Sequence, residues 1–202
     1  MTVVTATWGR PKTILERAIP SVRAQDYRPI EHIIVTDGRD PDLNRVLNGA
    51  GYSETGRFAR LVSLGRNWTG FSGDGAIGAV PRLVGSYLAA GDYICYLDDD
   101  NEFLPHHVST LAGLLESQNA DLACSRYLHA GQPSGSPPPG RDRTDTSSFM
   151  HRASVLKHGS WGLDGYAGDG LLVERWVAAG VKWAFTEEIT MVLHAHRSGA
   201  PD

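Results

Sequence analysis

The sequence contains few cysteines. Only Cys95 and Cys124 occur among its 202 residues, and neither belongs to a CxxC pair or to a spacing typical of a metal site. Both stand in apolar segments that are typical of strands, which favours reduced thiols in the core over a disulfide or a cysteine metal centre.

An excess of basic residues and a long apolar run are also missing. The chain has 19 Lys and Arg against 23 Asp and Glu, a formal net charge of -4, so nucleic acid is not an expected partner. The N-terminus lacks a basic stretch followed by a long apolar run, and no segment approaches the roughly 18 consecutive apolar residues of a membrane-spanning helix. We therefore expect no membrane span and a cytoplasmic location.

The composition, with 41% hydrophobic residues, is sufficient for a buried core. Strand patterns alternate with helical patterns over the first 130 residues. Strands are expected within 2–7, 31–38, 59–65, 92–98 and 120–130, and helices within 11–25, 41–51, 75–91 and 105–118. This alternation predicts an α/β fold with a doubly wound, mostly parallel sheet.

The second half departs from this alternation. Residues 131–145 are rich in Pro, Gly and Ser and have no apolar periodicity, which predicts a mobile loop or lid without folded elements. Beyond it we expect a helix within 168–180 and a pair of strands within 181–196. These segments are too short for an independent domain, so they are expected to extend the same sheet within a single domain, residues 1–202.

An apolar strand runs directly into three acids, Asp98, Asp99 and Asp100, which we call the acid run. Adjacent carboxylates repel one another, and a buried carboxylate is costly without a compensating cation or donor, so a positive group is expected there. Ligands bind at the carboxyl ends of strands in open α/β sheets. Asp98 and Asp100 can offer hard oxygens to Mg²⁺ or Mn²⁺ and leave positions for the phosphates of a nucleoside diphosphate. A solvated acidic turn is the alternative.

Five segments in order resemble the inverting GT-A glycosyltransferases of family 2, in particular the short bacterial members of the spore-coat polysaccharide type. The resemblance implies a GT-A domain with a nucleotide-binding half, 1–104, and an acceptor-binding half, 105–202. It also implies metal-dependent transfer of a sugar from a nucleoside-diphosphate sugar to a hydroxyl of a small molecule or saccharide. The segments are VVTATWGRPKTILERAIPSVRAQDY, IEHIIVTDG, PRLVGSYLAAGDYICYLDDDNEF, SSFMHRASVLKHG and GDGLLVERW.

The resemblance places the nucleotide beside the ends of the first two strands. Thr7 and Trp8 end the first strand, with Trp8 where an aromatic lies against the nucleobase, and Arg10 is a candidate for the diphosphate. Asp37 matches the acid that accepts an N–H of uracil, although a carboxylate suits guanine as well. The usual DDGS is TDGR at 36–39, so UDP is favoured but the nucleobase stays open. A packing role for Trp8 and a plain turn at Asp37 are the alternatives.

Further donor contacts are expected from the helix and the acid run that follow. Arg82 falls where the family carries a helix-borne arginine facing the nucleotide, with a surface salt bridge as the alternative. Asp98 and Asp99 are expected to contact the nucleotide sugar.

The expected metal ligands are Asp98 and Asp100, with a histidine near the C-terminus as the third. His194 and His196 are one residue apart and would share a face of a strand. Which of the two binds Mn²⁺ or Mg²⁺ stays open, and two histidines without a ligand role are the alternative.

Asp169 stands at the expected start of a helix, where an N-cap would explain it by itself. The resemblance implies instead that it is the general base, which takes the proton of the acceptor hydroxyl. Two rival functions remain: a nucleotidyltransferase acting on sugar phosphates, and a non-catalytic sugar-binding module with the same fold.

Overall fold

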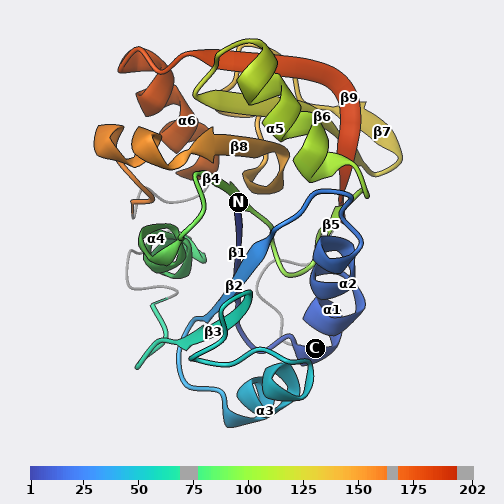
Figure 1. Cartoon of the computed structure of the whole chain (residues 1–202), viewed down its shortest axis with the longest axis vertical. Helices are drawn as coiled ribbons and strands as arrows, with labels where there is room; N and C mark the ends of the chain where they lie inside the picture. Colours follow the sequence, from blue (N-terminus) through green and yellow to red (C-terminus); the bar gives the residue numbers. More distant parts are fainter. Residues whose placement is uncertain (69–76, 163–167, 195–202) are drawn as a thin grey trace.

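Nine strands form one mixed sheet in the computed structural model, which describes residues 1–68, 77–162 and 168–194. The strands are β1 (Thr2–Thr7), β2 (Glu31–Thr36), β3 (Ala59–Ser63), β4 (Tyr93–Tyr96), β5 (Glu102–Phe103), β6 (Leu122–His129), β7 (Gln132–Ser134), β8 (Phe149–Arg152) and β9 (Trp183–Leu193). Their order is β3-β2-β1-β4-β8-β6-β9-β5, with β7 beside β6 (Figure 1). The sheet thus joins both halves of the chain.

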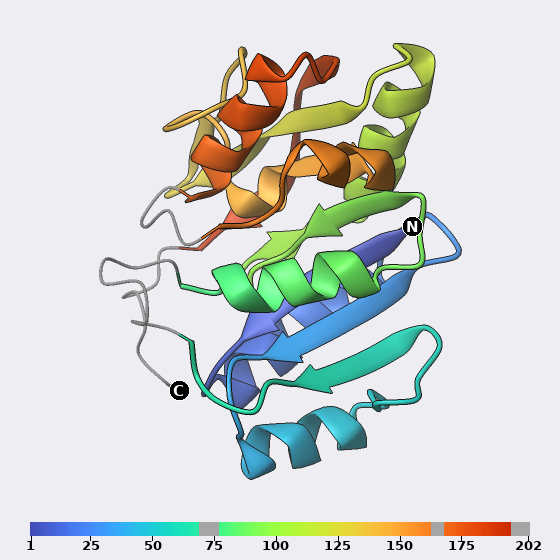
Figure 2. The same ribbon diagram turned by 90° about the vertical axis from the view of Figure 1, so that its left-hand side faces the viewer.

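The first half of the sheet is parallel, as predicted. β1 pairs with β2 and with β4, and β2 pairs with β3. All six residues of β1 are buried, as expected for a β-branched strand with helices on both faces. The carboxyl ends of β1, β2 and β3 lie on the same side of the molecule (Figure 2). The residues that follow these strands are therefore brought to one edge of the sheet.

The second half extends the sheet with antiparallel pairs. β8 lies between β4 and β6 and runs antiparallel to both, whereas β9 runs parallel to β6. The prediction of two strands within 181–196 was wrong, because β9 is one strand of 11 residues. Glu187 and Glu188 lie between the pairs that Thr186 and Ile189 make with β6, so they form a bulge. The bulge lets two acids point outward, where Glu187 pairs with Arg126 at 2.6 Å.

Helices cover both faces of the sheet. They are α1 (Pro11–Glu16), α2 (Ala18–Arg23), α3 (Pro41–Gly49), α4 (Ala79–Leu88), α5 (His107–Ser117) and α6 (Gly168–Ala178), with the 3₁₀ turns η1 (Thr146–Ser148) and η2 (Ala153–His158). Val3 and Cys95 belong to a core with α1, α2, α3 and α5, whereas Val4 and Cys124 belong to a core with η2 and α6, around Trp176. Both cysteines are free and buried, as predicted.

The single helix expected within 11–25 is two helices that meet at Arg17. Pro20 explains the break. A proline has no N–H for the carbonyl four residues earlier, and its ring clashes with that carbonyl. The carbonyl four residues before Pro20 is that of Glu16, where α1 ends. The break turns Arg17 toward the acid run, where its Nη1 donates to the carbonyl oxygen of Asp100 at 3.1 Å.

The segment 131–145 contains folded structure, so the expectation of a segment without it was wrong. β7 forms a hairpin with β6, and the backbone N–H of Thr144 donates to the carbonyl of Gly140 at 3.0 Å. The N–H of Arg141 reaches Glu174 on α6 at 2.9 Å. Composition did not reveal this because the strand pairs through its backbone. Mobility of the segment as a lid stays a prediction.

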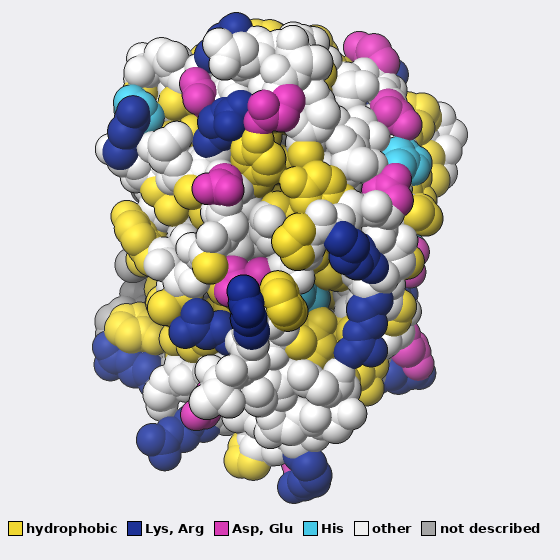
Figure 3. Space-filling view, in the orientation of Figure 1, with side chains coloured by type: hydrophobic (Ala, Val, Ile, Leu, Met, Phe, Trp, Pro, Cys, Tyr) yellow, Lys and Arg dark blue, Asp and Glu magenta, His cyan; other side chains and the backbone are white. Residues whose placement is uncertain are grey.

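The surface carries charges of both signs. On the face shown in Figure 3, basic and acidic side chains of the described residues are interspersed, with apolar side chains between them. Within the described ranges, no helix combines the length and the apolar character that crossing a bilayer requires.

Candidate active site

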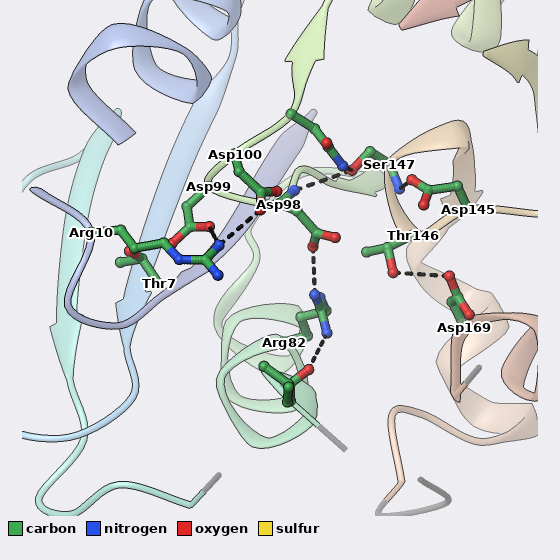
Figure 4. A network of polar contacts seen from close by, with 12 residues as sticks. Thr7, Arg10, Arg82, Asp98, Asp99, Asp100, Asp145, Thr146, Ser147 and Asp169 are labelled. Atoms are coloured by element: carbon green, nitrogen blue, oxygen red, sulfur yellow. Dashed lines mark hydrogen bonds and ion pairs between the residues drawn. The ribbon is translucent and has the colours of Figure 1, made fainter. Parts of the chain in front are cut away.

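The acid run lies at the carboxyl end of β4, between the loop that joins β1 to α1 and the turn η1. Figure 4 shows Asp98 between the pair Arg10 and Asp99 on one side and the pair Thr146 and Asp169 on the other. These residues come from the ends of strands and the starts of helices, the positions at which open α/β sheets bind ligands. The predicted residues Arg10, Asp98, Asp99 and Asp169 are therefore brought to one edge of the sheet.

Two arginines compensate the three acids. Nη1 of Arg10 lies 3.0 Å from Asp99 Oδ1 and 2.8 Å from Asp100 Oδ2. Nη2 of Arg82 lies 2.5 Å from Asp98 Oδ1. Burial acts to lower the pKa of Arg10, but attraction to Asp99 and Asp100 raises it, so the guanidinium stays charged. The positive group expected beside the acids is thus supplied at least in part by the chain itself.

Asp99 points into the protein. It is 5% exposed, and its Oδ2 accepts a hydrogen bond from the Thr7 hydroxyl at 2.7 Å. Burial raises the pKa of Asp99 to about 7, although Arg10 and Thr7 act in the opposite direction. Asp99 therefore links β4 to β1 and holds Arg10 beside the acid run.

Arg82 lies at the centre of the site. Besides Asp98, it donates from Nη1 to the carbonyl of Ile77 at 2.9 Å, and its guanidinium lies 5.0 Å from the ring centroid of Trp161. Burial acts to lower the pKa of Arg82, but Asp98, with smaller contributions from Asp169 and Asp145, raises it. The arginine is thus held between an aromatic ring and a group of carboxylates.

Asp37 and Trp8 lie at the ends of β2 and β1. Asp37 is 3% exposed, and its Oδ1 accepts the backbone N–H of Trp68 at 2.9 Å. Gly38 has φ of 107°, and a Cβ there would lie 2.9 Å from the backbone nitrogen of Asn67, so this close approach requires glycine. Trp8 is 42% exposed. A packing role in the core therefore does not account for Trp8.

Asp169 stands in the first turn of α6 and faces η1. Its Oδ2 accepts the Thr146 hydroxyl at 3.1 Å, and its Oδ1 accepts the N–H of Gly170 at 2.8 Å. Burial raises the pKa of Asp169, and Asp98 acts in the same direction, while Gly170, Arg82 and Thr146 oppose the rise. A carboxylate with a raised pKa is suited to accepting a proton.

The sequence did not reveal that Asp145 and the hydroxyl groups of Thr146 and Ser147 belong to this site. Asp145 caps η1 by accepting the N–H of Ser147 at 2.8 Å, and Ser148 completes a capping box. Burial raises the pKa of Asp145, and Asp98 and Asp169 raise it further. The sequence did contain a signal, because Asp145 is followed by three hydroxyl residues, a pattern typical of a helix start. The Pro, Gly and Ser content of the preceding residues obscured this pattern.

Asp98, Asp100 and His194, the predicted metal ligands that the structure describes, are not assembled into a cluster. Among the residues that the structure describes, no group of three His, Cys, Asp or Glu side chains is arranged to hold a metal ion. The N–H of His194 donates to Asn101 at 3.1 Å, and its Nε2 lies 3.5 Å from Glu102, next to the acid run. His196 lies outside the described residues.

Comparisons with known proteins agree on the fold. TarS from S. aureus, residues 1–349 in complex with UDP-GlcNAc, is 16% identical with a TM-score of 0.75, covering 99% of this chain and 59% of that chain. The mannosyltransferase PcManGT from Pyrobaculum calidifontis, in complex with GDP-Man and Mn²⁺, is 13% identical with a TM-score of 0.74, covering 98% of this chain and 57% of that chain. The protein thus spans less than two thirds of either structure, and no curated protein sequence matches it.

A family model decides the classification. The model for glycosyl transferase family 2 matches residues 2–168, which is most of the chain. The α/β fold with its curled sheet agrees with the glycosyltransferase structures above. The protein therefore belongs to glycosyl transferase family 2 and has the GT-A fold.

Proposed function

We propose that the protein is an inverting hexosyltransferase. It moves a sugar from a nucleoside-diphosphate sugar, with a UDP-sugar favoured, to a hydroxyl of a small molecule or saccharide. The observation that carries the proposal is the placement of Asp169, whose carboxylate has a raised pKa, beside Arg82 and the acid run (Figure 4). A general base and a donor-binding edge are the two parts that such a transfer requires.

The donor occupies the edge formed by β1, β2 and β4. Trp8 offers an exposed ring for the nucleobase. Asp37 is buried and accepts the N–H of Trp68, so a nucleobase N–H has to take the place of an existing contact to reach this carboxylate. Complexes of TarS with UDP-GlcNAc and of PcManGT with GDP-Man support a nucleotide-sugar donor, and they leave both nucleobases in consideration. Arg10 and Arg82 stand close enough to the acid run to turn from it toward a diphosphate.

Asp169 removes the proton of the acceptor hydroxyl. The hydroxyl oxygen attacks the anomeric carbon from the face opposite the nucleotide, so the new C–O bond forms as the bond to the diphosphate breaks. The proton passes to the Asp169 carboxylate, and the configuration at the anomeric carbon is inverted. The raised pKa of Asp169 favours this proton transfer.

The carboxylate oxygens of Asp98 and Asp100 suit a divalent cation, Mn²⁺ or Mg²⁺, once Arg10 and Arg82 turn from them. Asp98 and Asp100 are hard oxygen donors that already face positive groups, and these ions accept one or two carboxylates together with phosphate oxygens. PcManGT was solved with Mn²⁺. Asp98 and Asp100 would hold the ion, with His194 or His196 as a third ligand. The bound ion would offset the charge that develops on the leaving diphosphate.

Titration calorimetry with UDP and with GDP, in Mn²⁺ and in EDTA, tests the donor and the metal together. We expect UDP affinity to fall sharply in EDTA and in Asp100→Asn, because both remove charge compensation at the phosphates. Asp42→Asn, at an exposed acid whose side chain is 81% exposed, is the matched control. Equal UDP affinity with and without metal would defeat the metal proposal.

The same protein samples separate the rival functions. Release of UDP from UDP-GlcNAc indicates a glycosyltransferase, because such enzymes hydrolyse their donors slowly when the acceptor is absent. Pyrophosphate formed from a nucleoside triphosphate and a sugar phosphate would indicate a nucleotidyltransferase. Binding of UDP-GlcNAc without any cleavage would indicate a non-catalytic module.

A further inference from the structure

The turn η1 connects the acid run to α6. On one side, Ser147 Oγ accepts the backbone N–H of Asp98 at 3.1 Å and the side-chain amide of Asn101 at 3.3 Å. On the other side, the Thr146 hydroxyl donates to Asp169 at 3.1 Å. Two neighbouring residues therefore contact both parts of the site (Figure 4).

The turn has little freedom to move. Ser147 is fully buried and Thr146 is 6% exposed. Asp145 fixes the start of the turn by accepting the N–H of Ser147, and its own N–H donates to Ser148 Oγ at 3.0 Å. A buried turn that is hydrogen-bonded at both ends can hold a hydroxyl group at a fixed position.

We propose that Thr146 is a positioning residue for the general base. Its hydroxyl orients the Asp169 carboxylate and stabilises the ionised form, while Ser147 fixes the turn relative to the acid run. This inference rests on the proposed function, because Asp169 must act as the base. Thr146 contacts neither donor nor acceptor in this role, so it acts through Asp169.

The charges around Asp169 explain why one hydroxyl matters. Arg82 on α4 favours the ionised carboxylate, whereas Asp98 beyond β4 disfavours it. Asp145 before η1 and Tyr127 on β6 also interact electrostatically with Asp169. Burial already raises the pKa of Asp169, and Thr146 is among the groups that oppose this rise. Loss of the Thr146 hydroxyl therefore raises the pKa further and leaves the carboxylate less well oriented.

Carbon-13 NMR titration of the Asp carboxyl groups tests the inference without a substrate, with the Asp169 signal assigned by its absence in Asp169→Asn. We expect Thr146→Val, which keeps the shape, to raise the pKa of Asp169, and Thr146→Ser, which keeps the hydroxyl, to restore it. Thr5→Val is the matched control, because Thr5 is buried and its hydroxyl hydrogen-bonds His32 at 2.9 Å. If Thr146→Val does not fold, Thr146→Ala replaces it in the comparison with Thr146→Ser.

Cleavage of UDP-GlcNAc with Mn²⁺ provides the second readout. We expect Thr146→Val to lower kcat by about 10-fold, the effect of one hydrogen bond to a charged group, because the loss of orientation outweighs the slightly stronger base. The acid limb of the pH profile of kcat should move to higher pH, and UDP affinity should not change. A folded Thr146→Val protein with the wild-type pKa of Asp169 and wild-type kcat would overturn the inference alone, provided that Asp169→Asn is inactive. Full activity of Asp169→Asn would overturn the proposed base, and the inference with it.

Discussion

Arg10 and Arg45 both pair with aspartates, but their surroundings differ. The side chain of Arg10 is 12% exposed and bridges Asp99 and Asp100, whereas the side chain of Arg45 is 76% exposed and pairs with Asp42 at 2.9 Å. Removing one partner of a buried pair leaves an uncompensated charge, while an exposed pair is screened by water. The two arginines should therefore contribute very differently to stability.

We predict that Arg10→Met lowers the free energy of unfolding by about 3 kcal/mol. Arg45→Met should lower it by about 0–1 kcal/mol. Urea unfolding at pH 8, above the raised pKa of Asp99, measures both values. Similar small losses in the two variants would show that Arg10 is not needed to compensate the acid run.

Asp145 should make stability depend on pH. Its pKa in the folded protein is raised above the ordinary carboxyl value of 3.8, chiefly by burial and then by Asp98 and Asp169. As the pH rises above about 4, the unfolded chain releases this proton first, so the folded state loses stability until Asp145 itself ionises. Below the ordinary carboxyl pKa, Asp145 is protonated in both the folded and the unfolded state, so it does not change the stability.

We therefore predict that Asp145→Asn, which cannot titrate, gains stability relative to the wild type as the pH rises from 4 to 8, by at most about 1.4 kcal/mol per pH unit. The asparagine can still accept the N–H of Ser147, so the cap is kept. Thermal melts across this range provide the test, with Asp42→Asn as the control. A difference in stability between Asp145→Asn and the wild type that stays constant from pH 4 to pH 8 would show that the pKa of Asp145 is not raised.

At the scale of elements, two glycines inside helices have different reasons to be there. Gly85 in α4 faces the sheet, and a Cβ at this position would lie 2.3 Å from Val4 Cγ1. Gly113 in α5 is exposed, and a Cβ there would meet nothing within 4 Å. Gly85 lets α4 pack closely on β1, whereas Gly113 has no such role.

Substitution of these glycines by alanine tests the packing of α4. Gly85→Ala should destabilise the protein by about 1–3 kcal/mol through overpacking. Gly113→Ala should stabilise it by about 0.5–1 kcal/mol, because alanine favours the helix more than glycine does. The melting temperatures should therefore move in opposite directions. A stabilised Gly85→Ala protein would show that α4 does not pack on β1 as described.

For the whole molecule, much of the fold could be predicted from apolar patterns. Buried strands such as β1 and β4 are uniformly apolar or β-branched, and the helices between them keep a helical period. The features that escaped prediction depend on the backbone. Pro20 ends α1 through the carbonyl of Glu16, and the bulge at Glu187 and Glu188 continues β9 across two acids that resemble a turn.

The site could be predicted less completely than the fold. Residues at strand ends were identified, because the topology brings those ends together. The sequence could not show that Arg10 and Arg82 compensate the acids, because the pairing depends on which side chains the fold brings close together. Asp145 and Thr146 were missed because their segment lacks apolar periodicity, and only the folded turn places them beside Asp169.

Cleavage of UDP-GlcNAc by the wild type and by Asp169→Asn, in Mn²⁺ and at equal protein concentration, tests the central claim that Asp169 is the general base. Asparagine matches the size of the carboxylate and can still accept the Thr146 hydroxyl, so folding and UDP affinity should be retained. We predict that turnover falls by about 10²- to 10⁴-fold, the usual contribution of a positioned base, while Asp42→Asn cleaves the donor at the wild-type rate. Near-normal turnover by a folded Asp169→Asn protein would contradict the claim.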